Sequence, residues 1–478
     1  MLQLQRLTES IIARINVNLR KHGFDAGKSL REQIRMDQFT NFYAFYGLTS
    51  EHPLLFRFER SSLSGSYLLG KCVVLDSIVY KSDVRGDELK RRTGRFDVEG
   101  MPVPMHTDES IHIRDSYLIK TLVHNFSHDP MYPESFPIHN TASMFYANIH
   151  GSPSEGCFMG AFSTVDLTTV RNCVIGDFAY VQTGELFGER VEPGHIWIRS
   201  EGKFDFSYKH SKSVLKRYVG SEPGKRPDGV FMKFLDQRKP DYERVFGYLY
   251  ATEPEHTAKG SFVSRYSVVK GKSHIGENAL VAQRAYVEES WLGKGANAQE
   301  NCYILHSRLD GLDVTAHGGK VIHTRLGRKV FVGFNAFLRG TPEFKLKIGE
   351  GGIVMPHTII DLREPLEIPP ATIVWGYVRC AEDLKRNSIS IEELSKVRGR
   401  IKVGGMTFEG DGGTFVTGFA GRIEHILEAN GAFYDGFDNA GHAQMTKNIK
   451  YNIIQPYSDT DLMGIYPSMR IYPMEYQS

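Results

Sequence analysis

The chain has 478 residues, of which 41% are hydrophobic and 24% are charged, the mixture of an ordinary globular protein. Its formal net charge of +2 is too balanced to indicate nucleic-acid binding, and the length predicts two or three domains. No apolar run approaches about eighteen residues, which argues against a membrane span. The N-terminus lacks the compact apolar core of a secretory signal, and the five scattered cysteines do not form a disulfide framework. We therefore expect a cytoplasmic protein.

The first part of the chain is predicted to be helical. Apolar residues between Leu7 and Leu19 follow helical spacing. A turn at Asp25 should separate this helix from a second one over residues 28–43. We expect an N-terminal helical segment over residues 1–59.

A strand pattern begins near residue 60. Cys72, Ile78 and Val84 are six residues apart, and a similar string returns in altered form over residues 115–123. An aliphatic residue every six positions, with small or turn-forming residues between, is typical of a hexapeptide parallel β-helix. This pattern predicts a first set of β-helical coils over residues 60–202.

Residues 203–260 interrupt the repeat. They are rich in Lys, Arg, Tyr and Pro, and the turn residues over 221–229 predict a loop. Residues 230–250 favour a helix. The basic character of this inserted segment is interpreted as a solvated face, with binding of an anionic substrate as the alternative.

The repeat is clearest over residues 261–380. Ile275, Val281 and Val287 keep the six-residue step, and Val332 begins the cleanest copy. Each coil of about eighteen residues buries its aliphatic side chains only by stacking on its neighbours. The fold class is therefore mainly β, a parallel β-helix with flanking helices and long insertions. An ordinary strand-rich domain with chance periodicity is the alternative.

The last segment, residues 381–478, is predicted to hold a closing helix and an extended tail. The helix should run from Ala381 to Val403 with an interruption near Asn387, where Ser390 or Ser395 could cap its second half. The Gly-rich stretch over 404–420 lacks the order of a phosphate-binding loop, and we interpret it as a flexible turn or arm.

Three histidines lie within eighteen residues of this second repeat: His306, His317 and His323. His306 and His323 are seventeen residues apart, close to one coil, so they should stack on adjacent rungs. His317 should lie one corner away, because it precedes His323 by six residues. A strand of five or six residues spans roughly 17–20 Å, whereas Zn–N bonds are about 2 Å long. The three can share an ion only if a second chain supplies one of them, which predicts a homotrimer.

This segment resembles the γ-class carbonic anhydrases over about residues 261–380. The matching residues are Asn297, Gln299, His306, His317 and His323, followed by the hexapeptide run that starts at Val330. The resemblance implies a left-handed β-helix and a trimer that binds zinc, or another divalent metal such as iron or cobalt, through these histidines. It also implies that metal-bound hydroxide attacks CO2 or a related small substrate, while Gln299 and Asn297 hydrogen-bond the hydroxide or substrate oxygens.

Two departures from that family bear on activity. Five residues separate His317 from His323 where the family has four, and Glu288 and Glu289 stand near the place of the family's active-site arginine. Glu288, Glu289 or Asp310 is the predicted proton shuttle, because these acids lie nearest in sequence.

Other interpretations stay open. Many hexapeptide-repeat proteins are acyl-CoA-dependent acyltransferases in which one histidine acts as general base, a role that His317 or His323 could fill without metal. The histidines could also be solvent-facing corner residues of a non-catalytic scaffold. A second histidine set in the first coils could bind another metal; its members are His124, His128, His139 and His150.

Overall fold

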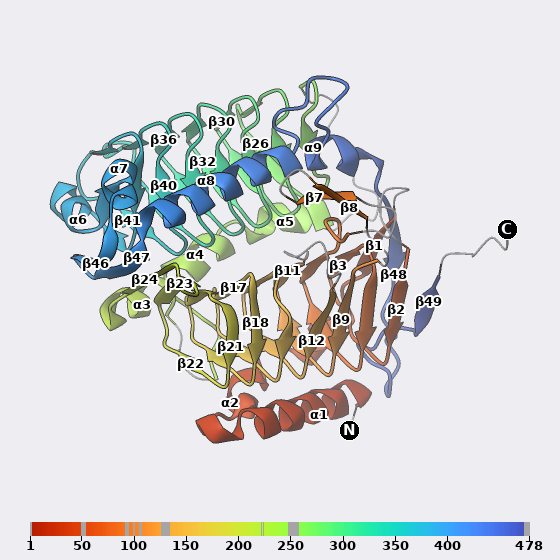
Figure 1. Cartoon of the computed structure of the whole chain (residues 1–478). Helices are drawn as coiled ribbons and strands as arrows, with labels where there is room; N and C mark the ends of the chain where they lie inside the picture. The colour runs from red at the N-terminus through yellow and green to blue at the C-terminus, as the bar shows by residue number, and fades with distance from the viewer. Residues whose placement is uncertain are drawn as a thin grey trace. The chain divides into compact units, whose positions relative to one another are not determined.

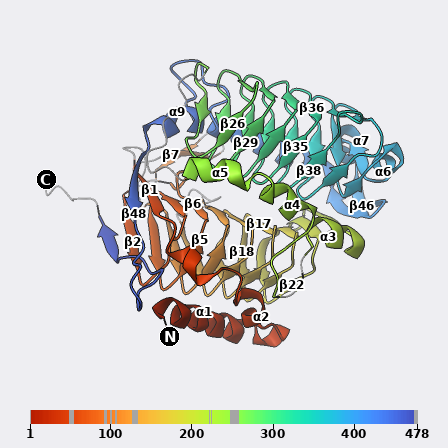
Figure 2. The ribbon, with the colours of Figure 1, turned by 180° about the vertical axis from the view of Figure 1, so that it is seen from behind.

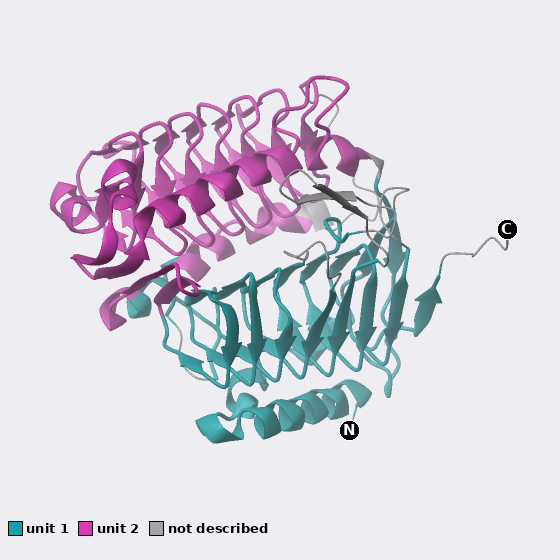
Figure 3. Cartoon of the chain, in the orientation of Figure 1, with its two compact units in different colours: residues 1–193, 215–230, 449–478 teal, residues 194–214, 231–448 magenta. Residues whose placement is uncertain are grey.

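The computed structural model describes residues 2–48, 54–90, 95–98, 101–104, 108–125, 134–220, 222, 224–246 and 258–472. The chain divides into two compact units (Figure 3). Unit 1 comprises residues 1–193, 215–230 and 449–478, and unit 2 comprises residues 194–214 and 231–448. Within the described ranges, no helix is both long enough and apolar enough to cross a bilayer.

Three parallel sheets form the faces of a β-helical prism in unit 1 (Figure 1). The first sheet holds β1 (Ala44–Leu48), β3 (Tyr67–Leu69), β6 (Asp83–Arg85), β11 (Leu122–His124), β14 (Asn148–His150), β17 (Thr164–Asp166) and β20 (Tyr180–Gln182), with β48 (Lys450–Ile454) antiparallel to β1. The second holds β5 (Ile78–Tyr80), β10 (Tyr117–Ile119), β13 (Ala142–Ser143), β16 (Phe158–Met159), β19 (Val174–Ile175) and β22 (Arg190–Val191). The third holds β2 (Phe56–Glu59), β4 (Cys72–Leu75), β9 (Ser110–Arg114), β12 (Ser135–His139), β15 (Ser154–Glu155), β18 (Thr168–Arg171) and β21 (Gly184–Phe187), with β49 (Met469–Ile471) antiparallel to β2. A separate hairpin joins β7 (Arg95–Val98) and β8 (Met101–Pro104).

Helix α1 (Gln3–Asn18) runs along the outside of this prism (Figures 1 and 2). It buries Leu4, Ile11 and Ile15, as its helical spacing predicts. The second predicted helix, over residues 28–43, is much shorter than expected: that region holds the end of α2 (Ala26–Leu30) and a 3-10 turn, Met36–Phe39. Another 3-10 turn, Arg20–His22, directly follows α1. Strand pairing begins at β1, so the coils already include residues within the N-terminal segment that the sequence pattern assigns to helix.

Apolar side chains of successive rungs fill the prism. On the first sheet the central residues Val84, Val123, Ile149, Val165 and Val181 are in register and fully buried. Burial of each contributes about 1.5–3 kcal/mol. Since side chains alternate along a strand, the residues on either side of this column point outward. The outward positions of β11, β14 and β17 are where the candidate site lies.

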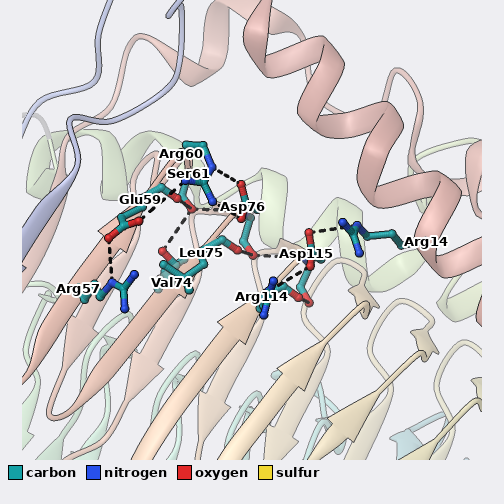
Figure 4. Close-up of polar contacts among 12 residues, drawn as sticks. Arg14, Arg57, Glu59, Arg60, Ser61, Val74, Leu75, Asp76, Arg114 and Asp115 are labelled. Atoms are coloured by element: carbon teal, nitrogen blue, oxygen red, sulfur yellow. Dashed lines mark hydrogen bonds and ion pairs between the residues drawn. The ribbon is translucent and has the colours of Figure 1, made fainter.

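Each corner needs one residue per rung in the left-handed conformation. Arg60, Asp76, Asp115, Asn140 and Asn172 occupy one such column, with φ between 46° and 52°. Asp and Asn tolerate this region better than other residues with a side chain. Charged corner residues also pair along the prism: Arg60 donates two hydrogen bonds of 2.6 Å to Asp76, and Arg14 of α1 lies 3.2 Å from Asp115 (Figure 4).

Hydroxyl ladders inside the corners satisfy buried backbone groups. Ser61 Oγ donates to Glu59 O (2.8 Å; Figure 4). The same Oγ accepts from Ser77 N (3.1 Å), and Ser77 Oγ accepts in turn from Ser116 N. Thr141 and Cys157 continue the column on the next rungs. Such ladders explain why small hydroxyl or thiol residues recur one coil apart, because a buried N–H without an acceptor is costly.

Unit 2 is a second prism with three parallel sheets. Its first sheet holds β25 (Phe262–Val263), β28 (Leu280–Val281), β31 (Asn297–Ala298), β34 (Val314–Thr315), β37 (Phe331–Val332), β40 (Ile353–Val354) and β43 (Thr372–Val374), with β45 (Ser388–Ser390) antiparallel to β43. The second holds β26 (Val268–Lys270), β29 (Tyr286–Glu288), β32 (Tyr303–Leu305), β35 (Lys320–Ile322), β38 (Phe337–Arg339), β41 (Ile359–Asp361) and β44 (Tyr377–Val378). The third holds β27 (His274–Ile275), β30 (Trp291–Leu292), β33 (Arg308–Leu309), β36 (Thr324–Leu326), β39 (Leu346–Ile348) and β42 (Leu366–Ile368).

The inserted segment is ordered where the structure describes it. It contains β24 (Phe204–Lys209), α3 (Lys212–Tyr218), α4 (Val230–Asp236) and α5 (Lys239–Phe246). Phe231 of α4 contacts Phe337 with ring centroids 5.1 Å apart, and Tyr242 of α5 contacts Tyr286 at 6.0 Å. Helices α4 and α5 therefore pack on the second sheet of unit 2.

The Gly-rich stretch was predicted to be a flexible turn or arm, and that prediction is wrong. Strand β24 pairs with β23 (His195–Ser200) and with β47 (Met406–Asp411), which pairs in turn with β46 (Arg398–Val403). Asp411 then caps α8 (Gly412–Ala429) by accepting from Thr414 N. The helix is stabilised by tertiary packing of its apolar face, mainly through Phe415 and Phe419, which outweighs the low helix propensity of its glycines.

The end of the second prism is closed by short elements. Helix α6 (Ala381–Arg386) stops at Asn387, as predicted, and β45 separates it from α7 (Ile391–Ser395). Ser390 caps α7 in a capping box with Glu393, so of the two serines proposed as caps it is Ser390 that fills this position. The remaining helices are α9 (His442–Met445) and a 3-10 turn, Thr446–Asn448.

Candidate functional site

The structure places the three predicted metal ligands at two different corners of unit 2. His306 and His323 follow β32 and β35 on adjacent rungs, and their rings stack with centroids 4.8 Å apart and an interplanar angle of 8°. His317 follows β34 and is only 2% exposed. Because β35 lies between His317 and His323, the three side chains of one chain do not fit around a single ion.

Two of the three predicted proton shuttles, Glu288 and Asp310, are held by basic partners. Glu288 lies 3.5 Å from Lys270 Nζ and accepts from the Tyr286 hydroxyl (3.1 Å). Glu289 is exposed at the corner itself. Partial burial raises the pKa of Asp310, but hydrogen bonds from two arginines outweigh it, so the pKa is lowered overall. A carboxylate held in its ionised form is a weak proton donor.

Asn297 and Gln299 lie instead toward the corner of His317. Asn297 is 1% exposed, and neither Nδ2 nor Oδ1 of its side chain has a hydrogen-bond partner among the described residues. Gln299 is half-buried, and its backbone N–H donates to Thr315 O (3.2 Å). A buried amide without hydrogen-bond partners costs about 1–3 kcal/mol of folding stability. The side chain of Asn297 therefore destabilises the fold, which makes it a candidate for a functional role at this corner.

His317 has a carboxylate neighbour that sequence reasoning missed. Glu300 Oε2 lies 3.0 Å from His317 Nδ1, and both residues are at most 2% exposed. Glu300 precedes His317 by seventeen residues, the length of one coil in this unit, as the rung-to-rung bond of Ser307 N to Ser290 Oγ also shows. Applying that offset to each histidine would have identified Glu300.

A second histidine–carboxylate pair lies on the outward side of the first sheet of unit 1. His150 ends β14 and Asp166 ends β17, and the two are register partners. His150 Nδ1 lies 2.8 Å from Asp166 Oδ1, with Asp166 fully buried. The Tyr180 hydroxyl donates to the other carboxylate oxygen, Oδ2. Asp166 is therefore fixed from two sides and, as the acceptor, favours the His150 tautomer with the proton on Nδ1.

His124 lies one rung away from His150. The two are register partners at the ends of β11 and β14, and their rings meet edge to face with centroids 5.1 Å apart. His124 Nε2 lies 3.3 Å from Glu88 Oε2. Of the other two histidines in the predicted second set, His139 lies on β12 of a different sheet, and His128 is outside the described residues.

The pair around His150 could have been found from coil length alone. Asp166 follows His150 by sixteen residues, one coil in unit 1. The two histidines are farther apart in sequence because residues of an insertion lie between β11 and β12. Because of this insertion, the sequence separation of His124 and His150 is longer than one coil. Their position on adjacent rungs therefore cannot be inferred from the separation alone.

Comparison with known proteins gives a family and a relative. Residues 101–223 match the family model described as a hexapeptide repeat including loop. A crystal structure from Desulfovibrio desulfuricans G20, named a putative acetyltransferase, is 53% identical, with 99% of this chain and 100% of that chain covered and a TM-score of 0.92. A Bacillus cereus structure with the same designation is 13% identical over 36% of this chain and 93% of that chain, with a TM-score of 0.12, and supports no conclusion. No curated protein matches the chain.

Proposed function

Because the chain belongs to the hexapeptide-repeat family of the Desulfovibrio desulfuricans protein, we propose that it is an acyltransferase whose general base is a buried histidine held by a carboxylate. The name of that relative and the hydrogen bond between His150 and Asp166 support this function together. This favours the acyltransferase alternative over hydration of CO2.

The chemistry follows from the orientation of His150. With the Nδ1 proton held by Asp166, the ring would accept the proton of an acceptor hydroxyl or amine at Nε2. The acceptor oxygen or nitrogen then attacks the thioester carbonyl of an acyl-CoA, and the carbon–sulfur bond breaks. The imidazolium returns its proton to the leaving thiolate, so free CoA and the acylated acceptor are the products. Asp166 stabilises the imidazolium throughout, because its negative charge lies beside Nδ1.

His317 with Glu300 is the corresponding pair in unit 2. The sequence already nominated His317 as a base, and Glu300 supplies the carboxylate partner. We place it second because Asp166 has a further donor, Tyr180, that fixes its orientation.

The test is release of CoA from acetyl-CoA and longer acyl-CoAs, followed with a thiol reagent, in the presence of amine and hydroxyl acceptors. Loss of a general base should lower kcat by about 10²–10⁴-fold, so His150→Gln and Asp166→Asn should both fall into that range. His139→Gln is the matched control, since His139 lies in the same unit on another sheet. Full activity in His150→Gln with loss in His317→Gln would move the base to unit 2. Full activity in both variants would refute the proposal.

Metal-dependent hydration of a small electrophile is the second candidate. The observation that favours it is the stacked pair of His306 and His323, since burial and the neighbouring His306 lower the pKa of His323 and keep the ring neutral for a metal. A partner chain would have to supply a His317 to complete the ion's ligands. Light scattering on the purified protein tests this directly, because a monomer cannot form the shared site.

Three finer features stay predictions. We propose that both prisms wind in the left-handed sense and that three chains associate, as the resemblance to γ-class carbonic anhydrases implies, and that the protein resides in the cytoplasm. An experimental structure and light scattering test the first two, and fractionation of the source cells tests the third.

A further inference from the structure

A pocket in unit 1 lies where the end of α1 meets the prism. Its volume is about 330 Å³, within the range of about 300–1,000 Å³ that small-molecule sites occupy. The two histidine–carboxylate pairs described above do not line it. Its lining residues are Val17, Asn18, Arg20, Lys21, Arg171, Asn172, Phe187 and Gly188.

The floor of this pocket belongs to two adjacent rungs. Arg171 and Phe187 are register partners at the ends of β18 and β21, and the corners that follow them begin at Asn172 and Gly188, both with positive φ. The 3-10 turn after α1 is tied to the first corner, because His22 Nε2 lies 3.0 Å from Asn172 O. The pocket is therefore built by contacts between the helix end and the prism.

The charge of the pocket favours an anion. Among the described residues, Arg20 and Lys21 form no ion pair, and Arg171 Nε lies 3.8 Å from Glu155 Oε2 with both side chains more than half exposed, which makes that pair weak. A side chain on Gly188 would collide with Lys21 Nζ, so this ammonium group lies directly against the corner. The C-terminus of α1 adds only about half a negative charge, which the three cations outweigh.

One wall of the pocket is apolar. Phe187 is 49% exposed and Val17 is 74% exposed, which is high for large hydrophobic side chains. The Arg171 guanidinium lies 5.7 Å from the centroid of the Phe187 ring, so the cationic and apolar parts of the pocket are adjacent. A ligand that covered both exposed side chains would remove their apolar surface from water.

We propose that this pocket binds a phosphate monoester with an apolar body, the phosphate contacting Arg20, Lys21 and Arg171 and the body lying on Val17 and Phe187. A phosphate monoester carries a charge of about −1.5 to −2 at pH 7 and three strong acceptor oxygens, which suits three cationic donors better than a carboxylate does. Two sources share this chemistry: a free organic phosphate and the ribose phosphate of CoA, the second only if the proposed function holds.

The test is binding of three probes to the full chain, namely inorganic phosphate, glycerol phosphate and phenyl phosphate. Binding is followed by calorimetry and by broadening of the phosphorus NMR line of each probe. We expect phenyl phosphate to bind one site per chain and more tightly than the other two probes. Arg20→Gln and Arg171→Gln should each weaken its binding by about 10–100-fold, because each removes a charge-assisted hydrogen bond. Phe187→Ala should abolish the preference for phenyl phosphate over glycerol phosphate while leaving the affinity for glycerol phosphate unchanged.

Arg6→Gln is the matched control, because it removes one positive charge from an exposed position of α1 outside the pocket. Affinity retained in Arg6→Gln and lost in Arg20→Gln supports the proposal. An equal loss in both variants would show that the probe responds only to net charge, and would overturn it. No binding of phenyl phosphate at millimolar concentration, or a preference for it that survives Phe187→Ala, would also overturn it.

CoA and dephospho-CoA distinguish the two sources, because they differ by the ribose phosphate. Tighter binding of CoA than of dephospho-CoA that is lost in Arg20→Gln identifies CoA as the ligand. Equal binding of the two, with phenyl phosphate still bound at the pocket, identifies a free organic phosphate instead. Absence of acyl transfer with intact binding of phenyl phosphate would reject the proposed function and leave this site standing.

Discussion

His210 provides a stability prediction that can be worked through from the structure. It ends the β24 region of unit 2, is 8% exposed, and its Nε2 lies 2.9 Å from His357 O. Nε2 must carry a proton to donate to that carbonyl. Burial lowers the pKa of His210 from 6.5 to about 4, and the carbonyl of His357 opposes this only in part.

The sign of the pH effect follows from linkage. A base whose folded-state pKa is depressed contributes stability above its unfolded pKa, and this contribution is lost as the pH falls toward the folded pKa. The unfolded chain binds a proton near pH 6.5 and the folded chain only near pH 4. Between pH 7 and pH 4.5 the folded state should therefore lose about 2.5 kcal/mol through this one residue.

His210→Gln isolates the effect, because the glutamine amide can still donate to His357 O but does not titrate. The assay is urea unfolding followed by tryptophan fluorescence, which reports on unit 2 because Trp197, Trp291 and Trp375 all lie there. The unfolding free energies of variant and parent should converge or cross as the pH falls, with a relative gain for the variant of about 2–3 kcal/mol. His425→Gln, on the exposed face of α8, is the matched control. A constant difference between variant and parent from pH 7 to 4.5 would refute the reasoning.

Three further changes test the packing of unit 2. Ser307→Ala removes the acceptor of the buried Thr324 N–H (3.0 Å), so the free energy of unfolding should fall by about 1–3 kcal/mol. A loss of less than about 0.5 kcal/mol would argue that the hydroxyl ladder does not stabilise the prism. The Phe415 ring is 1% exposed, so Phe415→Ala should lower the free energy of unfolding, measured with urea, by about 3–5 kcal/mol. A much smaller loss would mean that this ring does not anchor α8. Gly333→Ala would place a Cβ 2.5 Å from Pro356 N, so a reduced melting temperature is expected; an unchanged one would contradict the close approach of these rungs.

The fold can be predicted from the sequence because every rung needs apolar side chains that point into the prism, and this requirement produces a regular repeat. Ile275, Val281 and Val287 recur every six positions because each successive face of the coil needs one inward side chain. The stacking of His306 on His323 follows from the same periodicity. Helix α8 could not be predicted in this way, because it depends on tertiary contacts of Phe415 that no local propensity encodes.

The candidate site was harder to predict for a related reason. A β-helix converts sequence offsets of one coil into contacts, so a carboxylate sixteen or seventeen residues from a histidine is its neighbour on the next rung. Motif searches look instead for residues a few positions apart, as on a helix. Glu300 and Asp166 therefore carried no local signal, although each lies one coil from His317 or His150.

The two histidine–carboxylate pairs also differ in what they can do. In the Asp166 pair the imidazole and the tyrosine hydroxyl both act on one carboxylate, so the ring orientation is determined before any substrate arrives. Preorganisation of this kind lets a base act without reorganising its surroundings. If the proposed acyl transfer uses His150, the reaction therefore depends on Asp166 as well as on the ring itself. Asp166→Asn should then lower kcat although His150 is retained, and unchanged release of CoA in this variant would contradict the role of the pair.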